Sequence, residues 1–119
     1  MMSAPGLGDI AARLSDLSRQ LDKATSGADV LDRKAVTTRH AYELAYSRAF
    51  LSAEGAMDVR KHKAVRAAAT EKLDAEIAEQ VLRACRGRIA TIKVQIETGR
   101  SLSAAMRAEV SLAGSGIMP

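Results

Sequence analysis

The sequence predicts an all-α protein, and three observations carry that prediction. Apolar residues recur at alternating spacings of three and four, which keeps them on one face of a helix. No stretch alternates apolar and polar residues in the way a half-buried strand does. The two prolines, Pro5 and Pro119, stand at the ends of the 119 residues, so no proline interrupts a helix between them. The expected architecture is a long antiparallel helical hairpin within a single domain.

The first predicted helix covers residues 7–24. Its apolar positions form a seam with three-four spacing, and that seam continues past the helix end. The sequence Thr25-Ser26-Gly27 consists of residues that interrupt a helix, but the three-four spacing of the apolar residues continues unchanged across it. We therefore expect a kink in the first arm of the hairpin, between two roughly collinear helices, and not a reversal. The seam consists of Leu7, Ile10, Leu14, Leu17, Leu21, Ala24, Ala28 and Leu31.

The second predicted helix covers residues 28–53 and is marked by aromatic residues. Tyr42, Tyr46 and Phe50 follow one another at intervals of four, which is typical of a packed helix face. The helix should end before Gly55, because glycine suits the left-handed conformation found after helix ends. Asp58 is a favourable N-cap for the next helix. The chain is therefore expected to reverse between these two residues.

The third predicted helix covers residues 58–98, and a short last helix covers 101–113. Thr98-Gly99 separates the two, with Ser101 as the cap of the short helix. Residues 1–6 and 114–119 are expected to be flexible ends. The expected apolar stripe of the third helix consists of Leu73, Ile77, Val81, Cys85, Ile89, Ile92 and Ile96.

Self-association follows from the composition. Hydrophobic residues make up 47% of the chain, but alanine is the most frequent of them and aromatic residues reach only 3%. Two helices with so little bulk cannot enclose a core, and each leaves part of its apolar face towards water. We expect a homodimer or higher oligomer, assembled as a helical bundle or coiled coil. The residues assigned to that interface are Leu7, Ile10, Leu14, Leu17 and Leu21.

The net charge is +4, and basic residues gather just after the predicted reversal. One interpretation is a phosphate-binding patch for nucleic acid. The other is an exposed helix start that pairs with acidic residues of 71–79 in a neighbouring chain. No aromatic residue interleaves with the basic ones, as it does in single-strand binders, which favours the second interpretation. The candidate nucleic-acid-binding residues are Arg33, Lys34, Arg60, Lys61, Lys63 and Arg66.

No set of residues indicates catalysis, a metal site or a cofactor. Neither His40 nor His62 has a second histidine four residues away, which argues against zinc. Cys85 lies on the apolar stripe and is expected to be a buried small hydrophobic residue. A magnesium site on two acidic pairs fails, because Glu97 is followed three residues later by Arg100. The carboxylates weighed for that site are Glu71, Asp74, Glu76 and Glu79.

Two segments carry a resemblance to known proteins. Residues 42–55 (YELAYSRAFLSAEG) join a tyrosine-rich helix to an acidic-glycine turn, and residues 101–109 (SLSAAMRAE) close the pattern. Between residues 32 and 109 the chain resembles small helical proteins of bacteriophages, especially those that infect actinobacteria. Most such proteins have no assigned function. The resemblance implies a phage origin and a place in the cytoplasm of an infected or lysogenic bacterium, and it brings no enzymatic residues.

The sequence as a whole predicts a non-enzymatic, self-associating helical accessory protein that acts through protein–protein contacts. Its expected partners are further copies of itself and an unidentified protein. Sequence-independent nucleic-acid binding in phage DNA metabolism or recombination is the alternative. No apolar run approaches the ~18 residues needed to span a membrane, so no membrane partner is expected.

Overall fold

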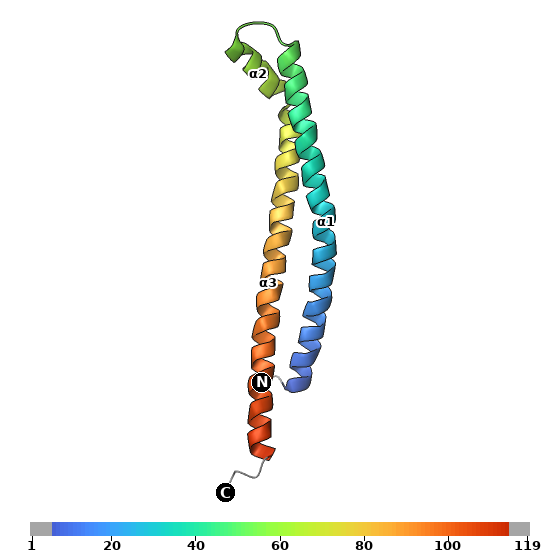
Figure 1. Cartoon of the computed structure of the whole chain (residues 1–119), viewed down its shortest axis with the longest axis vertical. Helices are drawn as coiled ribbons and strands as arrows, with labels where there is room; N and C mark the ends of the chain where they lie inside the picture. Colours follow the sequence, from blue (N-terminus) through green and yellow to red (C-terminus); the bar gives the residue numbers. More distant parts are fainter. Residues whose placement is uncertain (1–5, 115–119) are drawn as a thin grey trace, which may run out of the picture. The chain divides into compact units, whose positions relative to one another are not determined.

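A computed structural model describes residues 6–114, and nearly all of them are helical. Helix α1 spans Leu7–Ser52, α2 spans Met57–Ala67 and α3 spans Ala69–Gly114 (Figure 1). No strand occurs between residues 6 and 114, which confirms the all-α prediction. The chain divides into two compact units. Unit 1 joins residues up to Thr25 with those from Gly87 onwards, and unit 2 is Ser26–Arg86.

Unit 1 is held together by large aliphatic side chains. The first turns of α1 pack against the later turns of α3, and Leu17 is only 2% exposed between Ile92 and Ile96. Ile10 is buried as well. Burial of side chains of this size is the main stabilising contribution that helix packing offers. The half-buried residues around this cluster are Leu14, Leu21 and Ala24.

Unit 2 is held together mainly by alanine. It contains the second half of α1, all of α2 and the start of α3, and its core cluster is Ala35, Ala78 and Leu82. Two ion pairs link α1 to α3 at its edge, Arg39 with Glu79 and Asp32 with Arg86. As the α1 number rises the α3 number falls, so the two helices run antiparallel here. The other buried residues of unit 2 are Ala64, Ala68 and Ala75.

The buried face of α3 differs from the predicted stripe in the first half of the helix. Leu73, Ile77 and Val81 are exposed, and Ala75, Ala78 and Leu82 are buried instead. Steps of four advance the direction of the side chain by about 40° each on a helix of 3.6 residues per turn, so three such steps leave the packed face. Only alternating steps of three and four stay on it. From Leu82 onwards the residues at those steps are Cys85, Ile89, Ile92 and Ile96, as predicted.

The expected division of the first arm into two helices, 7–24 and 28–53, is wrong, because α1 has no break at residues 25–27. Ala24 and Ala28 stay half-buried on either side of Gly27, together with Leu31. A glycine in a helix costs ~1 kcal/mol relative to alanine. The packing of the continuing seam outweighs that cost, so the helix continues.

The expected separation of a short C-terminal helix is also wrong, because α3 continues through Gly99 to Gly114. A Cβ atom at Gly99 would lie 2.7 Å from Cδ2 of Leu14. The glycine therefore serves the close approach of α1 to α3, and it does not end the helix. Of the predicted flexible ends 1–6 and 114–119, residues 1–5 and 115–119 lie outside the described residues. Gly6 precedes the first helical residue, and Gly114 is the last residue of α3.

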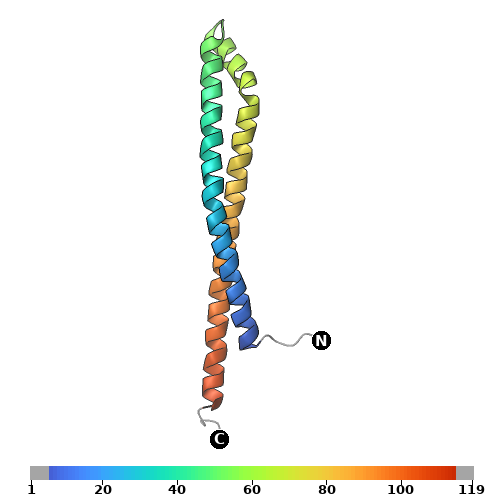
Figure 2. The ribbon, with the colours of Figure 1, turned by 90° about the vertical axis from the view of Figure 1, so that its right-hand side faces the viewer.

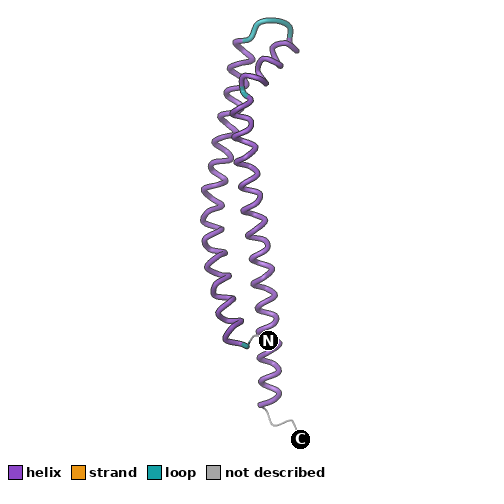
Figure 3. Tube along the Cα trace, turned by 180° about the vertical axis from the view of Figure 1, so that it is seen from behind, coloured by secondary structure: helices purple, strands orange, loops and turns teal. Residues whose placement is uncertain are grey.

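The chain reverses where the sequence predicts, at residues 53–56 (Figure 3). Gly55 has a φ of +113°, in agreement with the predicted left-handed conformation. Asp58 is not the N-cap, because α2 begins one residue earlier and Ala56 takes the capping position without a side-chain hydrogen bond. An additional break at Ala68, which the sequence analysis did not predict, separates α2 from α3 (Figure 2).

Candidate interaction surface

The leucines assigned to an interface between copies lie largely inside unit 1. Ile10 and Leu17 are 6% and 2% exposed, so their burial is complete within one chain. Leu7, Leu14 and Leu21 are half-buried on the same seam. This corrects the assignment for Ile10 and Leu17, because the later turns of α3 already provide the apolar surface that a second copy was expected to supply.

A different set of apolar residues is left exposed, on α3 in unit 2. Leu73, Ile77 and Val81 are 56%, 49% and 45% exposed. They follow one another at intervals of four, so they form one short row on the helix surface. All three belong to the apolar stripe that the sequence predicts to be packed. We call this row, together with the groove beside it, the α3 apolar surface.

The groove is formed between α1 and α3 within unit 2, with a volume of about 370 Å³. Ile77, Val81 and Leu31 supply most of its apolar wall. Its rim carries one cation from α1, Lys34, and one anion from α3, Asp74. The α3 apolar surface thus combines exposed aliphatic side chains with both signs of charge.

The exposure of these three side chains is unusual because the core of unit 2 contains so few large apolar residues. Five of its six buried hydrophobic residues are alanines, and Leu82 is the one larger side chain among them. Scattered exposed aliphatic residues are normal on proteins. A row of three beside a core of alanines is a surface that a partner could cover.

No family model, curated protein or solved structure matches this chain. The geometry of its own side chains is therefore what bears on function.

Unit 1 carries a second groove of about 350 Å³. Leu14, Val94 and Leu102 are among its apolar walls, and Gly99 leaves the space that a side chain would fill. Asp9 and Arg13 lie at its edge. Arg13 forms an ion pair with Asp16, one turn further along α1.

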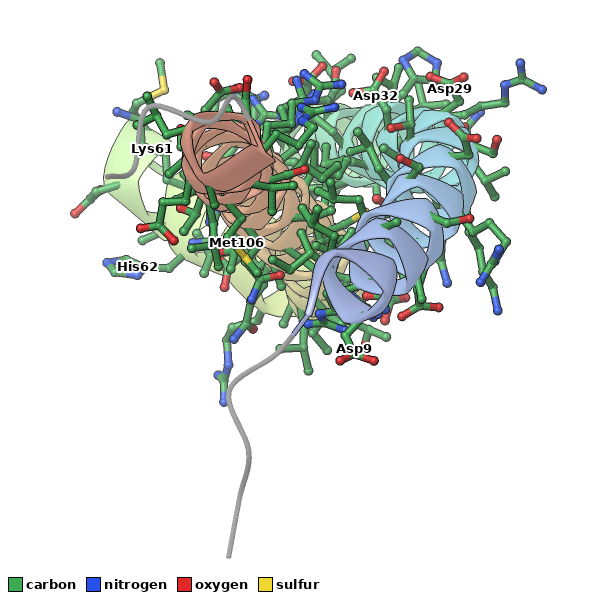
Figure 4. All side chains as sticks on the ribbon, turned by 90° about the horizontal axis from the view of Figure 1, so that it is seen from below. Asp9, Asp29, Asp32, Lys61, His62 and Met106 are labelled. Carbon is green, nitrogen blue, oxygen red and sulfur yellow. The ribbon has the colours of Figure 1, made fainter. Side chains whose placement is uncertain are left out.

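The basic cluster is divided between two uses. Arg60 donates from Nε and Nη2 to the backbone oxygen of Phe50, at 3.4 and 3.1 Å, and Lys63 donates from Nζ to the backbone oxygen of Glu54 at 3.0 Å. Arg60 therefore caps the carbonyl end of α1, which has no basic residue in its own last turn, and Lys63 binds the connection that follows α1. Lys61 is exposed on α2, and the neighbouring His62 points away from α1 (Figure 4).

The remaining candidate cations lie on two different helices. Arg66 is exposed near the end of α2, while Arg33 and Lys34 are exposed on α1. Lys34 belongs to the rim of the unit 2 groove. Of the six candidate nucleic-acid-binding residues, two are engaged within the chain and four remain on the surface.

The three aromatic residues form a half-buried ladder along α1. The rings of Tyr42 and Tyr46 meet edge to face at 6.3 Å, and those of Tyr46 and Phe50 stack at 6.5 Å. The guanidinium carbon of Arg60 lies 4.4 Å from the centre of the Phe50 ring, a cation–π contact. The ladder is thus packed in part by α2, although none of its rings is fully buried.

Two of the carboxylates weighed for a metal site pair with cations, whereas Oε2 of Glu71 is buried without a hydrogen-bond partner. Glu79 accepts from Arg39 and Glu76 pairs with Lys72. The hydrogen bond and the charge of Glu79 raise the pKa of Arg39 above its usual value. Cys85 is half-buried on the α3 seam, where the sequence placed it. In the part of the chain from residue 6 to 114, no three histidine, cysteine or carboxylate side chains converge as a metal site would require.

Among the described helices, none is both long and apolar enough to cross a membrane.

Proposed function

We propose that this chain is a non-enzymatic helical protein that self-associates and acts through protein–protein contacts. The observation that carries the proposal is the α3 apolar surface, in which three aliphatic side chains are exposed beside a core made almost entirely of alanine. A second copy of the chain is the partner that this surface fits best.

The charges at the rim support a second copy as the occupant. Lys34 and Asp74 stand on opposite walls of the same groove. In a two-fold dimer each copy presents the same patch, so the cation of one copy can lie near the anion of the other. Such complementarity favours one register of the two copies over others.

The expected affinity is modest. Full burial of an aliphatic side chain of this size stabilises by ~1.5–3 kcal/mol, and Leu73, Ile77 and Val81 are already about half covered. Six such residues across a two-fold interface must also offset the cost of association. Because these two contributions are of similar size, we expect a weak dimer with a dissociation constant no tighter than micromolar.

The resemblance to actinobacteriophage proteins supports the biological setting of this proposal. In that setting the protein is an accessory of phage or prophage origin in the cytoplasm of an infected or lysogenic bacterium. It acts on DNA metabolism, virion assembly or a host factor by presenting its helical surface to a partner protein.

The test is the mass of the protein in solution when the apolar surface is charged. Leu73→Asp with Val81→Asp should reduce the mass measured by light scattering to that of one chain, with the far-ultraviolet circular dichroism unchanged. Val36→Asp is the matched control, because Val36 is 62% exposed on α1 and does not line the groove. An unchanged mass in the double variant would contradict the proposal.

Nucleic-acid binding is the competing function, and the same samples address it. Labelled DNA at 50 mM salt should show no rise in fluorescence anisotropy if the chain works through protein contacts alone. A rise that Lys61→Ala with Arg66→Ala abolishes, in a protein whose mass is that of a single chain, would favour the competing function.

A further inference from the structure

The break between α2 and α3 has no cause in the local sequence. It falls at Ala68, between Ala67 and Ala69, and alanine is the strongest helix former. Ala68 has φ −101° and ψ 12°, while its N–H still donates to Ala64 and its carbonyl still accepts from Lys72, both at 3.0 Å. The departure from a helix is therefore small and confined to one residue.

The packed face also continues through the break. Ala64 and Ala68 are 0% exposed, Ala75 and Ala78 are 5% exposed, and Glu71 between them is half-buried. The steps from residue to residue are four, three, four and three, which is the seam spacing of α3 itself. A straight helix through Ala68 would keep these alanines on the face that α3 turns towards α1.

Two cations of α2 contact the end of α1 and the connection after it. Arg60 binds the backbone oxygen of Phe50 and lies over its ring, and Lys63 binds the backbone oxygen of Glu54. The last carbonyls of a helix have no partner within it. The bend therefore keeps the hydrogen bonds of Ala68 itself and adds a cap on α1 and a bond to the connection after it.

We propose that the α2–α3 junction is a two-state hinge with Arg60 and Lys63 as its latch. In the latched state α2 is bent at Ala68 and covers the end of α1. In the released state α2 and α3 form one continuous helix, the same alanines stay packed, and Phe50 and the carbonyl of Glu54 lose their contacts with α2. The proposal is independent of self-association, because it concerns contacts within unit 2 alone.

The hinge can be measured as a distance between spin labels on α2 and α3. Labels at Val59→Cys and Gln80→Cys, in a Cys85→Ala background, are 21 residues apart. A continuous helix places their backbone positions about 32 Å apart at 1.5 Å per residue, and the bend shortens that separation. Pulsed electron resonance on the otherwise unchanged chain should show the shorter distance as the main population.

Releasing the latch should transfer population to the longer distance. Arg60→Ala with Lys63→Ala is expected to raise the fraction near 32 Å at least fivefold, and Arg60→Lys, which keeps the charge but loses the planar contact with Phe50, should give an intermediate fraction. Lys61→Ala is the control, because Lys61 is exposed on the same helix, and it should leave the distribution unchanged. If the double variant and Arg60→Lys both keep the original distribution, or if the unchanged chain already shows only the longer distance, the hinge is refuted.

Discussion

At the scale of single residues, the glycines show how one residue type serves different purposes in this chain. Gly55 has a positive φ in the connection after α1, and Gly99 allows Leu14 to approach α3 closely. Gly27 and Gly87 lie inside helices with open space where a Cβ would stand. Local sequence predicts a helix end at Gly99. The close approach of two helices, which explains this glycine, cannot be inferred from local sequence.

Replacing Gly87 and Gly55 by alanine should change the free energy of unfolding in opposite directions. Gly87→Ala is expected to raise the free energy of unfolding by ~1 kcal/mol, because alanine is the better helix former and meets no neighbour. Gly55→Ala should lower it by ~1–2 kcal/mol, since an L side chain resists the positive φ and its Cβ would lie 3.3 Å from Val59. Urea unfolding of both variants, with Gly27→Ala as a second helix-interior control, measures the two changes. Equal changes in Gly55→Ala and Gly87→Ala would show that the backbone conformation at Gly55 does not matter.

At the scale of helices, the sequence predicts their existence well and their breaks poorly. The seam from Leu7 to Leu31 and the reversal at Gly55 were correctly placed, because periodicity and a left-handed glycine are local signals. Three expectations about continuity were wrong, at residues 25–27, at Gly99 and at Ala68. Whether a helix continues or breaks at each of these places depends on contacts with another helix. Local sequence does not contain that information.

The same reason explains what could be predicted of the candidate surface. Leu73, Ile77 and Val81 were correctly identified as one apolar row. Whether that row is packed or exposed depends on whether Ala75 and Ala78 face α1 instead, and a stricter count of three-four steps would have indicated it. The capping role of Arg60 depends on how α2 folds back, for which no sequence signal exists.

The ion pair between α1 and α3 gives a prediction about pH. Glu79 raises the pKa of Arg39, so the arginine is more readily protonated in the folded state than in the unfolded one. Such a group stabilises the fold below its unfolded pKa and loses that contribution only as the pH rises through the higher, folded value. Even the unfolded value lies far above neutral pH. The difference in urea midpoint between Arg39→Gln and the unchanged chain should therefore stay constant from pH 6 to pH 10.

A matched variant separates this pair from general surface charge. Arg83→Gln removes an exposed cation from the same region of α3. Added salt should shrink the effect of Arg39→Gln, because the arginine side chain is 61% exposed and its pair is screened. A midpoint difference that declines steadily between pH 7 and pH 10 would contradict the assignment to Arg39.

At the scale of the whole molecule, self-association is the property on which the proposed function depends. A two-fold interface at the α3 apolar surface requires Lys34 and Asp74 to face opposite charges on the partner. Lys34→Glu should weaken the dimer several-fold by placing like charges together, and Asp74→Lys should do the same. The double variant restores opposite charges and should regain most of the affinity, as measured by sedimentation equilibrium. Additive losses in the double variant would exclude this pairing.

The uneven distribution of large side chains has a consequence for how the chain opens. Ile10, Leu17, Ile92 and Ile96 all belong to unit 1, whereas unit 2 relies on small residues and a single leucine. Amide protons in α1 before Thr25 should therefore exchange with deuterium more slowly than those around Ala35, although one uninterrupted helix carries both. Unit 2 would be the first region to loosen in the isolated chain, and the region that gains most protection when a partner binds.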